Sequence, residues 1–375
     1  MTNTSEIIAE KLLSLSRKFG SEHADVLITK GRNESVEVRE GELEQIEGSD
    51  SLSISLRVIN NQKSAIVSCS DDSIESLEQM TKRATEIANE SIPNPFIGLA
   101  NNSDLAQQST KASIDLSEPE ELILNDPLKL KDMALRAEKA ALNSEGISKT
   151  DGSSASSSQH ELLLATSNGF SDSYNKSSYA IVASAISTCG SKMERDYAFE
   201  QRVYFEDLPQ PETIGLLAAK RAKMMQGAKK PVTGNYPVIF HERISGSIVS
   251  HILAAINGEA IARRSSWLLD SINNKILPEN VSLIEDPHLP RMSGSRPFDA
   301  EGLLTSKSFF VRNGILKSWI LDLKTSRQLG LKSTGNASRS AASPPSPGTG
   351  NMELKGGDKS LNDLLKEAGE GLMVC

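Results

Sequence analysis

Long runs of alternating apolar and polar residues in the first part of the chain constrain its fold more than any other feature. These runs are ADVLITKG (24–31), ESVEVREGELEQIEGSD (34–50) and SLSISLRVINNQKSAIVSCS (51–70). Such alternation is typical of strands that bury one face. The pairs Glu40-Gly41 and Asn60-Asn61 suit tight hairpin turns. The runs therefore predict an antiparallel sheet near the N-terminus.

Two amphipathic helices are predicted beside this sheet. The first precedes the strands and ends at Gly20, and the second follows them with Asp71 or Asp72 as its N-cap. Both carry apolar residues at helical spacing: Ile7, Ile8, Leu12, Leu13, Leu15 and Phe19 in the first, and Ile74, Leu77, Met80, Ala84, Ile87 and Ala88 in the second. Residues 1–92 are thus predicted to form an N-terminal α+β domain.

The rest of the chain divides into a linker and two further domains. The linker, 93–114, contains Pro93 and Pro95 and a polar run. Residues 115–228 are predicted to form a middle α+β domain, and 229–375 a C-terminal β-rich domain with a hairpin at Asn313-Gly314. Within it, NASRSAASPPSPGTGN (336–351) is too rich in Ser, Pro and Gly for regular structure. It is either a disordered loop or a rigid one that lines a cleft.

Charge and composition exclude several classes of protein. A formal net charge of −8 argues against a protein held to nucleic acid by phosphate contacts. No apolar run reaches the roughly 20 residues of a membrane span, and the N-terminus lacks the pattern of a signal peptide. Cys69, Cys189 and Cys375 lie far apart and form no CxxC pair. That usage fits a reducing cytoplasm, so we expect a cytoplasmic protein.

The stretch HERISGSIVSHILAAINGEAIARRSS (241–266) predicts a long amphipathic helix that begins with His-Glu, as the zinc helix of a metalloprotease does. The residue four positions after His241 is Ser245, so the second histidine of HExxH is missing. His251 lies about 80° around the helix from His241. A catalytic zinc ion needs three protein ligands and a water, and imidazoles from one helix must lie on the same face of that helix. We therefore interpret both histidines as structural or surface residues and predict no metal site here.

Other candidate sites are weaker. Glu285, Asp286 and His288 in EDPHLP form a small metal-like cluster, although such a turn is more often a capped loop. A Ser/His/Asp triad stays open because its members need not be adjacent, but there is no GxSxG motif. In MSGSRPFDAEG (292–302), Arg296 paired with Asp299 or Glu301 would hold a loop at a cleft. A surface turn is the alternative.

Several longer segments resemble one known family. They are EVREGELEQIEGSDSLSISLRV, KMERDYAFEQRVYFEDL, SHILAAINGEAIARRSSWLLD, GSRPFDAEG, GILKSWILD, TSRQLGLKSTGNASR and SPPSPGTGN. Their order along nearly the whole chain resembles the TldD/PmbA family of metalloproteases, which was named for modulation of DNA gyrase and includes processors of microcin precursors. The chain is most similar to its PmbA (TldE) branch.

The resemblance implies two kinds of subunit, of which only the TldD type carries the zinc site. The TldD branch has an HExxxH helix followed by a basic segment, and its third zinc ligand is a cysteine. When that basic segment is aligned on Arg263-Arg264, the two histidine positions fall on Ser250 and Ala255, and the glutamate position on His251. The resemblance therefore implies no catalytic or metal-binding residue and no cofactor in this chain.

Zinc is expected instead in a TldD-like protein partner. This chain would complete a chamber for extended peptides, without nucleic-acid or membrane partners. The residues expected to line that chamber are Arg263, Arg264, Arg296, Asp299 and Arg339.

The resemblance also bears on the C-terminal domain, and the residues leave two alternative functions. Family members continue beyond LLKEAGEGLMVC with further strands, so the resemblance implies a C-terminal domain that is incomplete and has an open sheet edge. A peptidase that acts alone through an unrecognised site is one alternative function. A regulatory module that binds other proteins is another.

Overall fold

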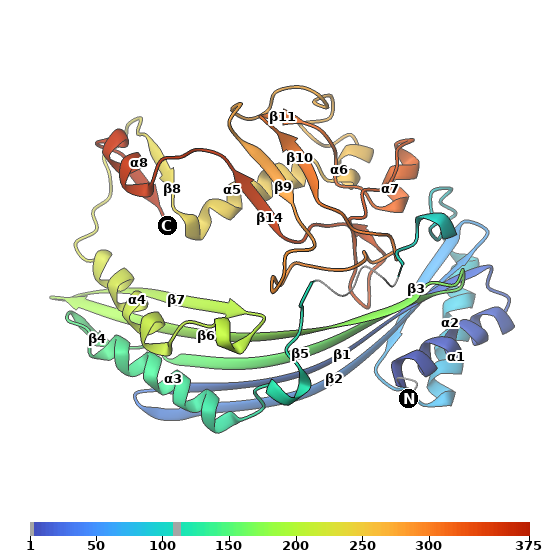
Figure 1. The fold of residues 1–375 in the computed structure, drawn as a ribbon, viewed down its shortest axis with the longest axis horizontal. Coiled ribbons are helices and arrows are strands. Elements are labelled where there is room, and N and C mark those ends of the chain that lie inside the picture. Colours follow the sequence, from blue (N-terminus) through green and yellow to red (C-terminus); the bar gives the residue numbers. More distant parts are fainter. Residues whose placement is uncertain (1–3, 108–113) are drawn as a thin grey trace.

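A computed structural model describes residues 4–107 and 114–375 of the chain. The polar run of the predicted linker, NNSDLAQQSTKAS (101–113), therefore lies partly outside the described residues. One long curved antiparallel sheet forms the base of the molecule, with helices on its outer face and the C-terminal region above its hollow face (Figure 1). The fold is α+β, as predicted.

Strands from both the predicted N-terminal and middle domains build this sheet. Its order is β3-β2-β1-β5-β6-β4, and β7 also pairs with β6. The β1 strand pairs with β5 from Asp25 opposite Thr166 to Val38 opposite Ser153, which joins the two domains through one continuous ladder. The strands are β1 (His23–Arg39), β2 (Glu42–Asn60), β3 (Lys63–Cys69), β4 (Ile147–Lys149), β5 (Ser153–Thr166), β6 (Ser171–Cys189) and β7 (Lys192–Arg202).

The hairpin turns follow the sequence closely. Glu40 and Gly41 both have positive φ, 54° and 79°, as predicted for a tight hairpin at this pair. The next turn uses Asn61 and Gln62, with φ of 48° and 64°, and so lies one residue later than predicted. In the C-terminal region, Asn313 and Gly314 form the predicted hairpin turn.

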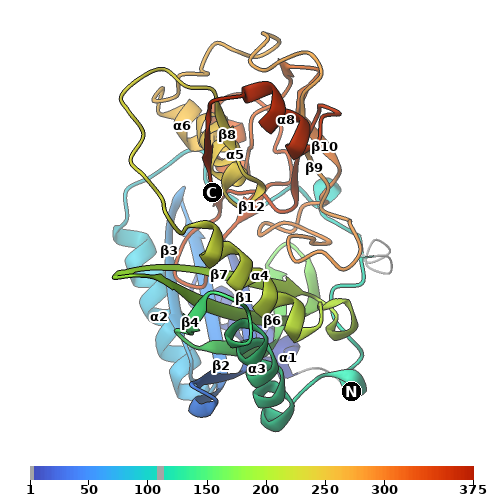
Figure 2. The ribbon, with the colours of Figure 1, turned by 90° about the vertical axis from the view of Figure 1, so that its left-hand side faces the viewer.

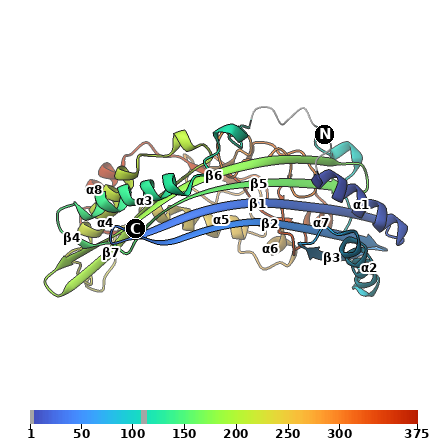
Figure 3. The same ribbon diagram turned by 90° about the horizontal axis from the view of Figure 1, so that it is seen from below.

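Four helices cover the outer face of the sheet in two pairs (Figure 3). Helices α1 (Thr4–Lys18) and α2 (Ile74–Glu90) pack at one end, and α3 (Pro127–Leu142) and α4 (Pro211–Met224) at the other. Each pair buries its own apolar cluster against the sheet. The N-cap of α2 is Ser73 rather than Asp71 or Asp72, because the Asp71 carboxylate accepts hydrogen bonds from Ser73 itself.

The C-terminal region is built from short elements around a four-stranded sheet of order β11-β10-β9-β14 (Figure 1). Seen from the side, this region lies above the long sheet (Figure 2). Its strands are β8 (Val238–Phe240), β9 (Ser282–Glu285), β10 (Ser308–Arg312), β11 (Ile315–Leu316), β12 (Ala337–Ser338), β13 (Ser346–Pro347), β14 (Met352–Lys355) and β15 (Leu372–Val374). Its helices are α5 (Glu242–Ala255), α6 (Gly258–Ala262), α7 (Leu323–Gln328) and α8 (Leu361–Ala368). Short 3-10 turns lie at Asn102–Asp104, Glu120–Leu122 and Phe205–Asp207.

The prediction of one helix over 241–266 is wrong. Helix α5 ends at Ala255, and α6 begins at Gly258 after Asn257, whose side chain accepts a hydrogen bond from the Glu259 N–H. Gly258 packs so closely on the Ile320 carbonyl that a side chain would collide with it. A new N-cap and a tertiary contact therefore break the helical periodicity. No helix in the described parts of the chain is long and apolar enough to cross a membrane.

The crossing of α3 and α4 yields a first prediction. A Cβ at buried Gly215 would overlap the Ala137 carbonyl oxygen of α3, whereas a Cβ at exposed Gly246 of α5 meets nothing within 4 Å. Gly215→Ala should therefore destabilise the protein by about 1–3 kcal/mol through overpacking. The matched Gly246→Ala should stabilise it by about 0.5–1 kcal/mol, since alanine loses less backbone entropy in a helix. Chemical denaturation measures both, and a stable Gly215→Ala protein would contradict the close crossing.

Candidate functional site

The hollow face of the sheet is distinct from the face that the helices cover. Val26 and Ile28 of β1 pack toward α1 and α2, so the alternate residues Asp25 and Leu27 face the C-terminal region. Along this face the strands carry many small hydroxyl side chains: Ser49, Ser51 and Ser53 of β2, and Ser154, Ser156 and Ser158 of β5. One end of the hollow face is covered by the C-terminal region, where Phe298 packs against Leu164.

A buried ion triad fastens the C-terminal region to the sheet. Asp25 and Arg57 lie opposite each other on β1 and β2, and the Arg57 Nε donates to Asp25 Oδ2 at 2.6 Å. The Nη1 of Arg339, from the loop after β12, donates to the other carboxylate oxygen. Burial alone would raise the pKa of Asp25, but the two guanidinium charges outweigh it and hold this pKa below its usual value.

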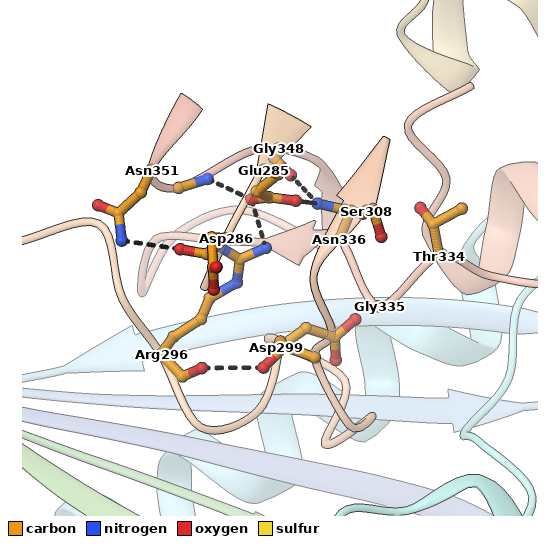
Figure 4. Close-up of polar contacts among 12 residues, drawn as sticks. Glu285, Asp286, Arg296, Asp299, Ser308, Thr334, Gly335, Asn336, Gly348 and Asn351 are labelled. Atoms are coloured by element: carbon orange, nitrogen blue, oxygen red, sulfur yellow. Dashed lines mark hydrogen bonds and ion pairs between the residues drawn. The ribbon is translucent and has the colours of Figure 1, made fainter. Parts of the chain in front are cut away.

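A second buried carboxylate organises the loops of the C-terminal region. Glu285, at the end of β9, accepts hydrogen bonds from Arg296 Nη2 at 3.0 Å, Asn336 Nδ2 at 2.6 Å and the Gly350 N–H at 2.6 Å (Figure 4). Glu285 therefore joins the loop that carries Arg296 to both ends of the segment 336–351. The predicted pairing of Arg296 with Asp299 or Glu301 is wrong, because Glu285 is its partner.

Asp299 and Glu301 are buried, and their carboxylates accept hydrogen bonds from backbone N–H groups instead. Asp299 accepts from the N–H groups of Glu301, Leu303 and Ala337, and Glu301 Oε2 accepts from the Leu323 N–H at 2.8 Å. Burial raises the pKa of Asp299. Burial, followed by the neighbouring Asp299 charge, raises the pKa of Glu301 to about 8. Near neutral pH, Glu301 therefore holds a proton that an ordinary glutamate would have lost.

These elements enclose a cavity of about 240 Å³ between the sheet and the C-terminal region. We call it the interdomain cavity. Its lining residues are Leu27, Leu162, Leu164, Tyr174 and Lys176 from the sheet, and Gly294, Arg296, Phe298, Asp299, Ala300, Ala337, Ser338, Arg339, Gly348, Thr349 and Gly350 from the C-terminal region. The segment 336–351 is thus an ordered loop at a cavity, one of the two predicted states. It also contains the paired short strands β12 and β13, so the prediction that it has no regular structure is wrong in part.

The structure brings together three of the five residues expected to line a chamber. Arg296, Asp299 and Arg339 all line the interdomain cavity. Arg263 and Arg264 do not: Arg263 ends α6 with its side chain 68% exposed, near Glu259, and Arg264 is exposed with a φ of 56°. Sequence reasoning missed Lys176, since a single lysine in a strand carries no signal of the loop that packs above it.

The candidate metal ligands have other partners. His241 caps α5 by accepting from the Arg243 N–H. In EDPHLP, Glu285 binds the Arg296 guanidinium. Asp286 pairs with Lys307, and His288 Nε2 contacts the Thr305 hydroxyl. Within residues 4–107 and 114–375, no group of three or more His, Cys, Asp or Glu side chains could hold a metal ion.

The helix that would carry zinc by family resemblance is α5. This helix carries all three positions of the HExxxH alignment. The two histidine positions are Ser250 and Ala255, and the glutamate position is His251. The Ser250 hydroxyl donates to the Gly246 carbonyl of the preceding turn, and Ala255 is an apolar buried residue. A serine that bonds its own helix and an alanine supply no imidazole, so these residues do not fit a zinc ion.

Comparison with known proteins identifies the family. Profiles for PmbA/TldA metallopeptidases match domain 1 at residues 24–88, the central domain at 117–226 and the C-terminal domain at 233–375. The chain is 32% identical to metalloprotease PmbA of Escherichia coli O157:H7 over 355 residues, covering 94% of this chain and 76% of that protein. The chain therefore belongs to the PmbA/TldD metalloprotease family.

Other relatives agree in sequence and fold. A metalloprotease PmbA homolog of Haemophilus influenzae is 32% identical over 363 residues, covering 96% of this chain and 77% of the homolog. Among solved structures, TldE from Thermococcus kodakarensis superposes with a TM-score of 0.85 at 20% identity, covering 97% of this chain and 81% of that one. At that identity, the structural likeness supports the fold alone.

The raised pKa of Glu301 predicts a pH-dependent stability. Because the folded state keeps a proton that the unfolded state releases near its ordinary pKa of 4.5, stability should fall as the pH rises from about 4.5 to about 8. Glu301→Gln keeps an oxygen acceptor for the Leu323 N–H and removes the titration. Its melting temperature should therefore change less between about pH 5 and about pH 9 than that of the wild type.

The matched control is Glu145→Gln, whose side chain is 93% exposed. This variant should retain the wild-type dependence of melting temperature on pH. Equal slopes for the wild type and Glu301→Gln would show that Glu301 titrates normally in the folded protein.

Proposed function

We propose that this chain is the PmbA (TldE)-type, non-catalytic subunit of a two-chain metalloprotease whose zinc is held by a TldD-like partner. The observation that carries the proposal is helix α5, where Ser250, His251 and Ala255 occupy the positions of the HExxxH residues. By that resemblance, two ligands and the general base of the family's zinc site have no counterpart on this helix. The names of the PmbA relatives and of the Thermococcus kodakarensis TldE support the same branch.

The proposed substrates are extended, unfolded peptides. The hollow face of the sheet presents small hydroxyl side chains, and β3 and β7 form the edges of the sheet. Extended peptides bind sheets through backbone N–H and C=O groups, which every sequence shares. Such binding would admit many peptide sequences and exclude folded proteins, which cannot offer a free strand.

A cytoplasmic location is part of the same proposal. Cys69, Cys189 and Cys375 are all free thiols in the structure, as expected for a protein kept in a reducing compartment. Nucleic acid is not a proposed partner, because the net charge of −8 opposes phosphate binding.

The proposal is tested by reconstitution. Purified, tag-free chain should contain far less than one zinc ion per molecule by elemental analysis and should not cleave unstructured peptides. Mixing with a TldD-like chain from the same organism should give a complex whose peptide cleavage is abolished by a chelator, because zinc enters with the partner.

Two results would favour the alternatives. Near-stoichiometric zinc with chelator-sensitive cleavage by the chain alone would show a peptidase with its own site. A well-formed mixed complex that cleaves no unfolded peptide would favour a regulatory protein-binding module.

A further inference from the structure

The interdomain cavity has a charge opposite to that of the chain as a whole. Its lining carries three cationic side chains, Lys176, Arg296 and Arg339, and one carboxylate, Asp299. The carboxylate oxygens of Asp299 accept three backbone N–H groups, and the salt bridges of the described residues include none from Asp299 to a cation of the lining. In a chain of net charge −8, this cavity therefore concentrates positive charge.

Two buried carboxylates outside the lining compensate part of that charge, because Glu285 pairs with Arg296 and Asp25 with Arg339. Asp25 is shared between two guanidinium groups, those of Arg57 and Arg339. Among the residues that the structure describes, the Nε and Nη2 atoms of Arg339 find no hydrogen-bond partner, although its side chain is only 1% exposed. A buried guanidinium with unused donors strongly favours a nearby anion.

Lys176 is the cation of the lining without a carboxylate partner. Its Nζ donates to the Ser293 carbonyl oxygen at 2.9 Å, and within the described residues it forms no salt bridge. Burial, and then the charge of Arg296, lower the pKa of Lys176 to about 8. Lys176 is therefore still mainly protonated near neutral pH, and an anion beside it would relieve the repulsion from Arg296.

The floor of the cavity is apolar. Leu27, Leu162 and Leu164 from the sheet meet Phe298, against which the Tyr174 ring packs edge-on with centroids 5.3 Å apart. A volume of about 240 Å³ is below the roughly 300 Å³ at which drug-sized ligand pockets begin. The cavity therefore suits one amino-acid residue, with an apolar side chain on the floor and a charged group beside the cations. Inorganic phosphate would leave the floor unused.

We propose that the interdomain cavity binds the C-terminal residue of an extended peptide, with the terminal carboxylate held by Lys176 and Arg296. This rests on the proposed function, in which the chain binds unfolded peptides. Charge-assisted hydrogen bonds from ammonium and guanidinium groups are the strong contacts for a carboxylate. The charge of Arg339, which also lines the cavity, adds to the attraction for the carboxylate.

The direct test compares two forms of one short, unstructured peptide that ends in leucine. One has a free C-terminal carboxylate, the other a C-terminal amide, and both carry a fluorophore at the N-terminus. Fluorescence polarisation with the full chain should show that the free acid binds at least about tenfold more tightly, because the amide loses the charge-assisted contacts. Equal affinities would overturn the inference.

Variants assign the carboxylate to the cavity. Lys176→Met should weaken binding of the free acid to the level of the amide and leave the amide unchanged, whereas Lys176→Arg should restore the difference. The matched control is Lys63→Met on β3, because Lys63 Nζ also donates to a backbone carbonyl, that of Asn89, but lies outside the cavity. A loss of affinity for both peptides in Lys176→Met would overturn the assignment.

Two further probes separate the possible sources of the anion. Inorganic phosphate that competes with the free acid but not with the amide would support an oxyanion subsite. An amidated peptide with an internal glutamate that binds as tightly as the free acid would overturn the assignment to the terminus.

The outcome for the proposed function is read separately. If both peptides bind equally and the complex with the TldD-like chain is active, only this inference is contradicted. If neither peptide binds and the complex with the TldD-like chain is inactive, the proposed function is contradicted as well.

Discussion

The arrangement of the molecule depends on one buried carboxylate. Asp25 lies on the hollow face of the sheet and binds Arg57 from the adjacent strand and Arg339 from a loop 314 residues further along the chain. Removing one partner from a buried ion pair typically costs about 3–5 kcal/mol, since the other charge is left uncompensated. The triad thus ties the C-terminal region to the sheet in one position, and the interdomain cavity exists because that position is fixed.

The cavity combines this anchor with a second one. Glu285 binds Arg296 and both ends of the segment 336–351, at Asn336 and Gly350, so this segment is held in place although its only regular structure is the short β12–β13 pair. The two carboxylates hold Arg339 and Arg296 at the cavity wall, whereas Lys176 bonds a backbone carbonyl and has no carboxylate partner among the described residues.

Sequence patterns predicted the local structure better than the long-range contacts. Alternation and turn residues gave the strands and hairpins because both depend on neighbours in the chain. The pairing of β1 with β5 could not be predicted, since many strands share the same alternation and no local signal chooses a partner. For the same reason Arg296 was assigned to nearby Asp299 or Glu301 rather than to Glu285. Lys176 was missed because its environment is set by a loop more than a hundred residues away.

The most direct test of the account is a double-mutant cycle between Asp25 and Arg339. The free energies of unfolding of Asp25→Asn, Arg339→Met and the double variant would be measured by chemical denaturation. If the triad fastens the C-terminal region, the two substitutions should be non-additive, with a coupling energy of about 1–3 kcal/mol. Effects that add within about 0.5 kcal/mol would show that Asp25 and Arg339 act independently, and that something else positions the two parts of the molecule.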